Sequence, residues 1–213
     1  LQEQSPYAEC GVLASYHYGE NGPRFPEPHV FDALKGRKLN LSLHLCGRLA
    51  LDSVATNFDA AIKFLGEERF NMFKRVQLNM HVRQVEQEQL AALTLKGRLE
   101  QIILQMHTPD MCRLFLSSDS HKECFCYLLD SSGGAGIDTP IDIVTQQGVE
   151  VGYAGGIGLG NVWGKLKTLL QHDDDSMFWI DMETRVRTNE ILNLELVEQV
   201  LVLSDALIKG YNV

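Results

Sequence analysis

The sequence lacks any apolar run near the roughly 20 residues that a membrane-spanning helix needs. It also shows no basic segment followed by an apolar one at its start, the pattern of a secretory signal. Basic residues are few, because 19 Lys and Arg stand against 28 Asp and Glu, and no run of Lys or Arg exceeds two residues. We therefore expect a soluble protein that binds neither membranes nor nucleic acid.

Cysteine pairs are also lacking. The five cysteines are odd in number and contain no CxxC pair: Cys10, Cys46, Cys112, Cys124 and Cys126. Such a set predicts reduced thiols in a cytoplasmic protein. Cys124 and Cys126 lie on one face of an expected strand, without the turn that zinc sites use. We expect these thiols to pack in the core, and we expect no metal and no cofactor.

No segment rich in Pro, Gly or Ser divides the chain, so a single domain over residues 1–213 is expected. Short β-rich runs alternate with helix-favouring segments. The expected strands cover 11–15, 39–45, 75–80, 101–106, 124–130, 149–154 and 177–182. The expected helices cover 27–35, 51–65, 85–95, 139–147, 161–170 and 194–207.

This alternation predicts a parallel sheet covered by helices. Seven strands exceed the five or six of an open doubly wound sheet and fall one short of a closed barrel. We therefore predict an α/β fold, a TIM-type (β/α)8 barrel that lacks its first βα unit. Unpaired sheet edges would follow, and a monomer or a homodimer is expected.

Polar side chains alternate with apolar ones along several expected strands. His44 shares one face of its strand with Ser42, Gln77 and Asn79 share a face of the next, and Asp130 ends a later strand. Barrel enzymes place their chemistry at the C-terminal ends of the strands, so these faces predict a site inside the barrel mouth. The two tryptophans, Trp163 and Trp179, are expected instead to pack between helices and sheet.

Two glycine-rich turns follow expected strands, at residues 131–136 and 155–160. Glycine allows backbone N–H groups to approach an anion closely, and the N-terminus of a following helix favours negative charge. The turns therefore predict a phosphate site on late strands of the barrel. The alternative is that the glycines serve only the conformation of tight turns.

Five short motifs, taken in order, resemble those of phosphoribosylanthranilate isomerase, a barrel enzyme of tryptophan biosynthesis. They are GPRF at 22–25, VQLN at 76–79, LDSSGG at 129–134, AGGI at 154–157 and IDMETRV at 180–186. The resemblance implies an isomerase, an aldose–ketose type of intramolecular oxidoreductase. It would rearrange a small phosphorylated sugar compound by acid and base chemistry.

The resemblance also implies roles for individual residues. Asp130 falls at the general acid, and apolar neighbours such as Leu128 would favour its protonated form. Arg24 falls where the family holds the carboxylate of its substrate. The phosphate would bind at Gly155, Gly156, Glu183 and Thr184, and the other substrate-binding residues would be His44, Gln77, Asn79, Gly133 and Gly134.

Three positions depart from the family pattern. The strand-one KICG motif with the catalytic cysteine is not found, and Cys10 begins its strand at the end away from the site. Asn79 stands in place of a histidine, and Glu183 and Arg185 replace a serine and a glycine of the phosphate loop. Glu183 would repel phosphate unless Arg185 or Arg187 compensates.

These departures leave two alternatives open. One is a non-catalytic homologue that binds a small ligand, and an upstream strand containing KxCG would argue against it. The other is a metal-dependent epimerase-like barrel, whose ligands would be His44, His81, His107 and Asp130.

Overall fold

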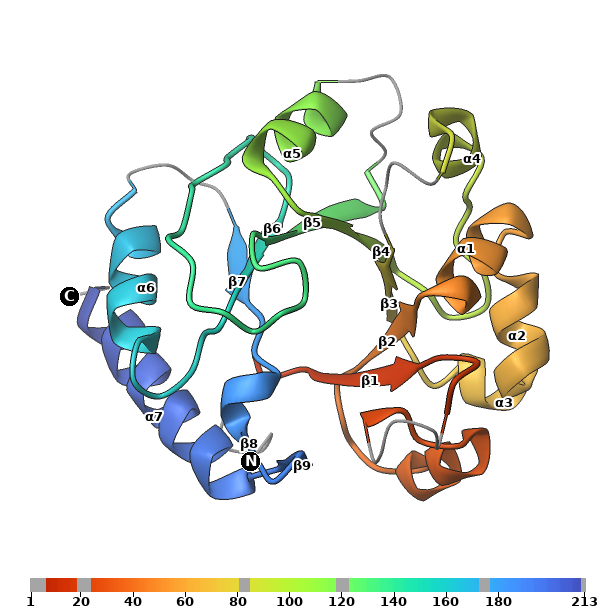
Figure 1. Cartoon of the computed structure of the whole chain (residues 1–213), viewed down its shortest axis with the longest axis horizontal. Helices are drawn as coiled ribbons and strands as arrows, with labels where there is room; N and C mark the ends of the chain where they lie inside the picture. Colours follow the sequence, from red (N-terminus) through yellow and green to blue (C-terminus); the bar gives the residue numbers. More distant parts are fainter. Residues whose placement is uncertain (1–6, 19–23, 81–84, 118–122, 173–176, 212–213) are drawn as a thin grey trace.

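The computed structural model describes residues 7–18, 24–80, 85–117, 123–172 and 177–211. Its main sheet has seven parallel strands in chain order, each paired with the next (Figure 1). The strands are β1 (Cys10–Ala14), β2 (Leu41–Cys46), β3 (Arg75–Asn79), β4 (Gln101–Met106), β5 (Phe125–Asp130), β6 (Val151–Ala154) and β7 (Phe178–Ile180). All seven expected strands are therefore present.

Helices lie around the outside of the curled sheet (Figure 1). They are the 3-10 helix η2 (Pro28–Leu34), α1 (Arg48–Ala55), α2 (Asp59–Leu65), α3 (Glu67–Phe70), α4 (Gln87–Ala91), α5 (Pro109–Leu116) and α6 (Val162–Leu170). After β7 come the 3-10 helix η4 (Thr184–Val186), the antiparallel pair β8 (Arg187–Thr188) and β9 (Ile191–Leu192), and α7 (Leu194–Tyr211). The predicted TIM-type α/β fold is confirmed.

The barrel is open at one seam. Within the described part of the chain, β1 pairs only with β2, and β7 pairs only with β6. An eighth strand of a closed barrel would lie between these two edges. The same described residues include no helix long and apolar enough to cross a membrane.

The outer face of the sheet packs against the helices. Leu43, Leu45, Val76, Leu78 and Tyr127 are fully buried there in one large apolar cluster. Each such side chain stabilises the fold by about 2 kcal/mol through removal of its apolar surface from water. The alternate residues face the barrel interior, so the strand parity predicted from the sequence holds.

The inward face holds a smaller apolar cluster of Ile103, Cys126 and Leu128, against which Trp179 packs. Trp179 therefore lies inside the barrel, and its expected place between helices and sheet is wrong. Gly152 makes the space, because a Cβ atom there would come within 2.2 Å of the indole ring. Trp163, the other tryptophan, is half exposed on α6.

The expected helix at 139–147 does not form. The Tyr153 hydroxyl accepts a hydrogen bond from the backbone N–H of Val144 at 3.2 Å and donates one to its carbonyl at 3.0 Å. These bonds replace the backbone partners that a helix would supply. Pro140 and the β-branched residues of this segment also favour an extended chain.

Two other helices differ from expectation. The expected helix at 51–65 divides into α1 and α2, because Asn57 and Phe58 adopt left-handed conformations with φ of 46° and 70°. Helix α5 was not expected from the sequence. Its start is nevertheless marked by Pro109 and by Thr108, whose side chain accepts from the N–H of Met111 at 3.2 Å.

Candidate active site at the barrel mouth

Asp130 is held at the mouth of the barrel by several hydrogen bonds. It ends β5, is buried, and accepts four hydrogen bonds. Gln105 Nε2 donates at 3.0 Å and the Gly134 amide at 2.7 Å, both to Oδ2, while the Ser132 amide and hydroxyl donate to Oδ1 at 3.1 and 2.7 Å. The groups bonded to Asp130 are hydrogen-bond donors, and Leu128, on the same inward face of β5, is buried in the apolar cluster with Ile103 and Cys126. Both carboxyl oxygens of Asp130 are thus held in place by hydrogen bonds from β4 and from the loop after β5.

A cleft opens beside Asp130 where the loops after β5, β6 and β7 meet. Its lining joins the two glycine-rich turns to the loop after β7: Asp130, Ser132, Gly134, Gly136, Ala154, Gly155, Gly156, Ile157, Asp181, Glu183, Thr184 and Arg185. Six of the eleven site residues predicted from the sequence, among them Asp130, Gly155 and Thr184, thus share one cleft. The sequence placed these motifs up to 54 residues apart.

The glycine turn after β6 is packed against the loop after β5. Gly156 has φ of 59°, and a Cβ atom there would lie 2.5 Å from the backbone nitrogen of Asp138. Only glycine therefore fits. Asn161 braces the turn, accepting from the Gly158 amide at 2.9 Å and donating to the Gly156 carbonyl at 2.9 Å and to Asp138 at 2.8 Å.

Glu183 is turned towards arginines. Arg24 reaches it with two nitrogens, at 2.8 and 2.9 Å, and Arg187 approaches at 3.1 Å. Of the two arginines expected to compensate Glu183, Arg187 does so, whereas the closer partner is Arg24, which was not expected in this role. Arg24, the residue expected to hold a substrate carboxylate, is engaged with a carboxylate of the protein itself.

Asp181 follows β7 on the inward-facing side, two residues after Trp179. Its own amide donates to the Tyr153 carbonyl at 2.9 Å. Burial, together with the negative charges of Glu183, Asp130 and Glu9, raises the pKa of Asp181 to about 7. Asp181 belongs to the IDMETRV motif but is not among the predicted site residues; its parity with Trp179 is the sequence signal that points it into the barrel.

The remaining predicted substrate-binding residues lie outside the lining of this cleft. Gln77 Nε2 donates to Asn79 Oδ1 at 2.6 Å, and Asn79 Nδ2 to the Cys46 sulfur at 3.4 Å. Gly133 turns the chain after β5 with φ of 62°. His44 is buried against Gly11, and burial and the nearby Arg75 charge lower the pKa of the imidazole to about 4.

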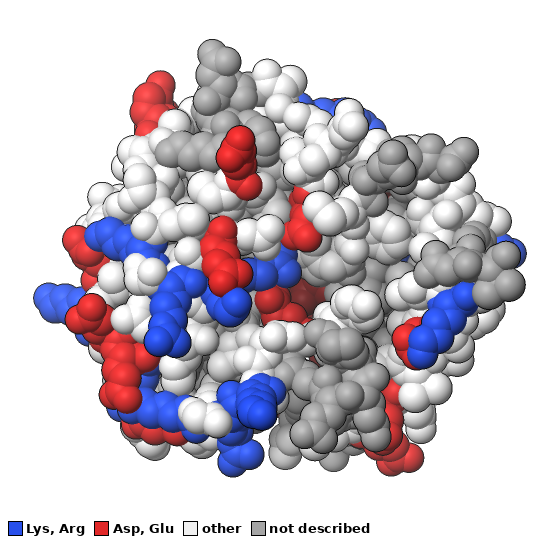
Figure 2. Space-filling model, turned by 180° about the vertical axis from the view of Figure 1, so that it is seen from behind, with Lys and Arg blue, Asp and Glu red and all other residues white. Residues whose placement is uncertain are grey.

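The opposite end of the barrel interior is arranged around Arg75. Its guanidinium lies 4.7 Å from the Trp179 ring centroid, 3.5 Å from Glu9 and 3.9 Å from Glu150, and Nη2 donates to the Cys126 sulfur at 3.6 Å. Figure 2, which views the molecule from the side opposite to Figure 1, shows acidic and basic side chains interspersed around a central hollow.

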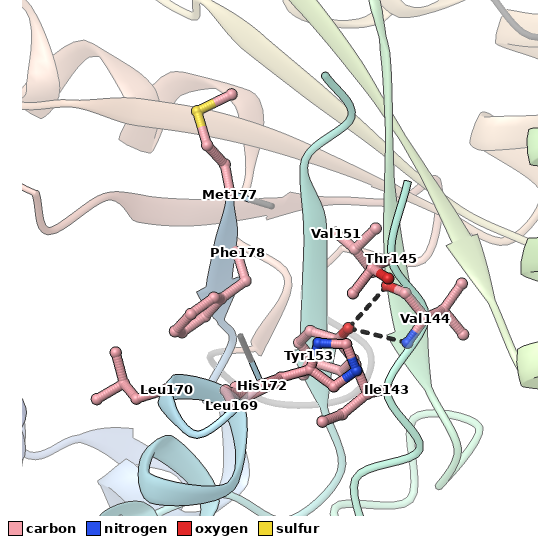
Figure 3. Close-up of a pocket in the computed structure, with 10 residues that line it drawn as sticks. All are labelled: Ile143, Val144, Thr145, Val151, Tyr153, Leu169, Leu170, His172, Met177 and Phe178. Atoms are coloured by element: carbon pink, nitrogen blue, oxygen red, sulfur yellow. Dashed lines mark hydrogen bonds between the residues drawn. The ribbon is translucent and has the colours of Figure 1, made fainter. Parts of the chain in front are cut away.

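A second hollow lies outside the barrel (Figure 3). Val151, Tyr153 and Phe178 line it from β6 and β7, facing the extended segment at 143–145 and the end of α6. Ten residues form its lining: Ile143, Val144, Thr145, Val151, Tyr153, Leu169, Leu170, His172, Met177 and Phe178. It carries no carboxylate or glycine-rich turn, so the mouth cleft is the better candidate for chemistry.

The metal-dependent alternative gains no support. Among the described residues, no three His, Cys, Asp or Glu side chains form a group able to hold a metal ion. His81 lies outside the described residues. The burial that lowers the pKa of His44 places its ring among packed side chains of the interior.

Comparison with known proteins supports the fold. No protein-family model matches the sequence, and no curated protein matches it. A similar solved structure is that of N-(5'-phosphoribosyl)anthranilate isomerase from Pyrococcus furiosus, with a TM-score of 0.56 and 16% sequence identity. The match covers 92% of this chain and 87% of that one. The chain therefore has the fold of that isomerase.

Proposed function

We propose that the protein is an isomerase of a small phosphorylated sugar compound that works by acid and base chemistry. The observation that carries the proposal is the setting of Asp130: a buried carboxyl group at the C-terminal end of a barrel strand, opening on a cleft. The motif resemblance and the fold of the similar structure support N-(5'-phosphoribosyl)anthranilate as the first substrate to test. A cytoplasmic enzyme of tryptophan biosynthesis is the corresponding cellular role.

The reaction class requires two proton transfers. A proton reaches the ring oxygen as the sugar ring opens, and a proton leaves the adjacent C2 carbon. The cleft supplies carboxyl groups for such transfers. Its glycine turns and Arg185 supply positive potential for a phosphate group.

The test is a turnover assay with N-(5'-phosphoribosyl)anthranilate on the wild type, Asp130→Asn and Asp110→Asn. Asp110 is exposed on α5, so its variant controls for the loss of one carboxylate. We expect Asp130→Asn to lose at least about 100-fold in kcat/KM while folding normally. If Asp130→Asn turns the substrate over as fast as the wild type does, Asp130 is not needed for the reaction.

A second candidate function is ligand binding without catalysis. The pairing of Arg24 with Glu183 favours it, because the arginine expected to hold a substrate already has an internal carboxylate partner. Calorimetric titration with ribose 5-phosphate separates the candidates. Binding without turnover of the phosphoribosyl amine would support the second function and exclude the first for that substrate.

A further inference from the structure

The crossing from β5 to β6 covers the outer face of the sheet without a helix. Residues 131–150, all of them described, contain neither helix nor strand, whereas α5 lies in the crossing before and α6 in the crossing after. The segment 143–145 is instead fixed to β6 by both hydrogen bonds of the Tyr153 hydroxyl to Val144. An extended chain is thinner than a helix, so a hollow is left between this segment, β6, β7 and the end of α6 (Figure 3).

We propose that this hollow is a binding site for a small uncharged ring compound, of the size of benzene or toluene. Its volume is about 130 Å³. Cavities of about 150 Å³ with apolar walls accept benzene, so a single ring fits the space. The hollow shares no lining residue with the mouth cleft, and the inference therefore does not depend on the proposed function.

The walls of the hollow are apolar. Val144, Val151 and Leu169 are buried members of the large apolar cluster on the outer face of the sheet. Phe178 packs against that cluster and also against a second one, which includes Val200 of α7. The hollow therefore interrupts the packing where two clusters meet. Atoms that border an empty space lack contact partners on one side, so a ring placed there gains dispersion contacts and removes its own apolar surface from water.

The polar groups of the lining favour an uncharged ligand. The ten described residues that line the hollow include no Lys, Arg, Asp or Glu. The Tyr153 hydroxyl already donates to the Val144 carbonyl and accepts from its N–H. Thr145 and His172 line the hollow with exposed side chains, so the opening lies on their side. A charge carried into the apolar part would lose its hydration without gaining a partner.

The first test is an NMR titration of the whole chain with toluene at pH 8. In the wild type, the ring protons of toluene should show nuclear Overhauser contacts to the methyl groups of Val144, Val151 and Leu169. Benzoate, which carries a carboxylate on the same ring, should bind at least about tenfold more weakly. No binding of toluene, contacts only to residues outside the hollow, or equal affinity for benzoate overturns the proposal.

The second test fills the hollow from two different walls. Leu170→Trp at the end of α6 and Thr145→Trp at the opening should each weaken toluene binding at least about tenfold, because the indole takes the space of the ring. Leu114→Trp, at an exposed position on α5, is the matched control and should bind toluene as the wild type does. Thr145 is exposed, so its variant decides the matter even where Leu170→Trp folds poorly. If folded Thr145→Trp binds toluene as tightly as the wild type, the hollow is not the site.

Discussion

The two ends of the barrel interior differ in how their charged side chains are arranged. At the N-terminal end, one cation, Arg75, lies among Glu9, Glu150 and the face of Trp179. At the mouth, Asp130, Asp181 and Glu183 line one cleft, and among the described residues Arg24 and Arg187 pair with Glu183. The first arrangement compensates charge, and we expect it to stabilise the fold. The second leaves Asp181 among like charges, which is the pattern of a functional site.

The largest effect is expected at the N-terminal end. Arg75→Met removes the cation between Glu9 and Glu150 and leaves two partly buried carboxylates without it, which should lower the free energy of unfolding by about 3 kcal/mol. Burial already raises the pKa of Glu9, and loss of Arg75 raises it further, so the deficit should grow as the pH rises through that pKa.

Denaturant unfolding at pH 5 and pH 8 measures this effect. Lys74→Met is the matched control, because the neighbouring Lys74 pairs with Glu100 on the surface with both side chains about two-thirds exposed. That variant should lose less than about 1 kcal/mol. If Arg75→Met and Lys74→Met both lose less than about 1 kcal/mol in the free energy of unfolding, the charge cluster around Arg75 does not stabilise the fold.

At the mouth, removal of a charged group should raise the free energy of unfolding. The folded-state pKa of Asp181 is raised from 3.8 to about 7, so the penalty for its charged form is absent below pH 4 and complete above pH 7. Asp181→Asn removes that penalty. Relative to the wild type, this variant should gain about 2 kcal/mol in the free energy of unfolding between pH 4 and pH 8, after allowance for solvent screening.

Thermal or denaturant unfolding across that pH range checks the sign. Asp110→Asn, at an exposed position on α5, should show no such gain with pH. A parallel pH dependence for the wild type and Asp181→Asn would mean that Asp181 titrates as an ordinary surface carboxyl, and the contrast between the two barrel ends would fail.

Local sequence patterns predicted the strands well because alternation has a direct physical cause. The faces of β2 and β3 follow from residues two apart, so His44 and Gln77 point inward as expected. The predictions that were wrong, the helix at 139–147 and the place of Trp179, concern segments whose structure depends on residues distant in the sequence. Tyr153 satisfies the backbone of Val144 from another strand, and Gly152 makes room for Trp179 on the next. Neither contact has a local signature.

In the candidate site, too, the sequence motifs predicted some features, and contacts between distant residues determine the others. Motif order predicted that Asp130, Gly155 and Thr184 share a site, and they line one cleft. The pairing of Arg24 with Glu183 joins residues 159 positions apart across the open seam. Asp181 was overlooked because its distinction is its environment: its neighbours in space, and not its neighbours in sequence, raise its pKa.

The smallest effect concerns anion binding at the mouth. Glu183→Gln keeps the size of the side chain but removes the negative charge that now engages Arg24 and Arg187. A negative charge about 4 Å from a bound anion opposes binding by an amount comparable with a few hydrogen bonds. Phosphate or ribose 5-phosphate should therefore bind to Glu183→Gln about tenfold more tightly than to the wild type, or by ~1.4 kcal/mol.

Calorimetric titration with inorganic phosphate, compared with the wild type and with Glu198→Gln on the exposed side of α7, measures this gain. The gain should shrink as salt is added, because Arg24 and Glu183 are both partly exposed and screening weakens their interaction. If Glu183→Gln binds phosphate no better than the wild type, Glu183 does not compete with anions at the mouth. Its two arginines would then serve to close the loop after β7 onto the barrel.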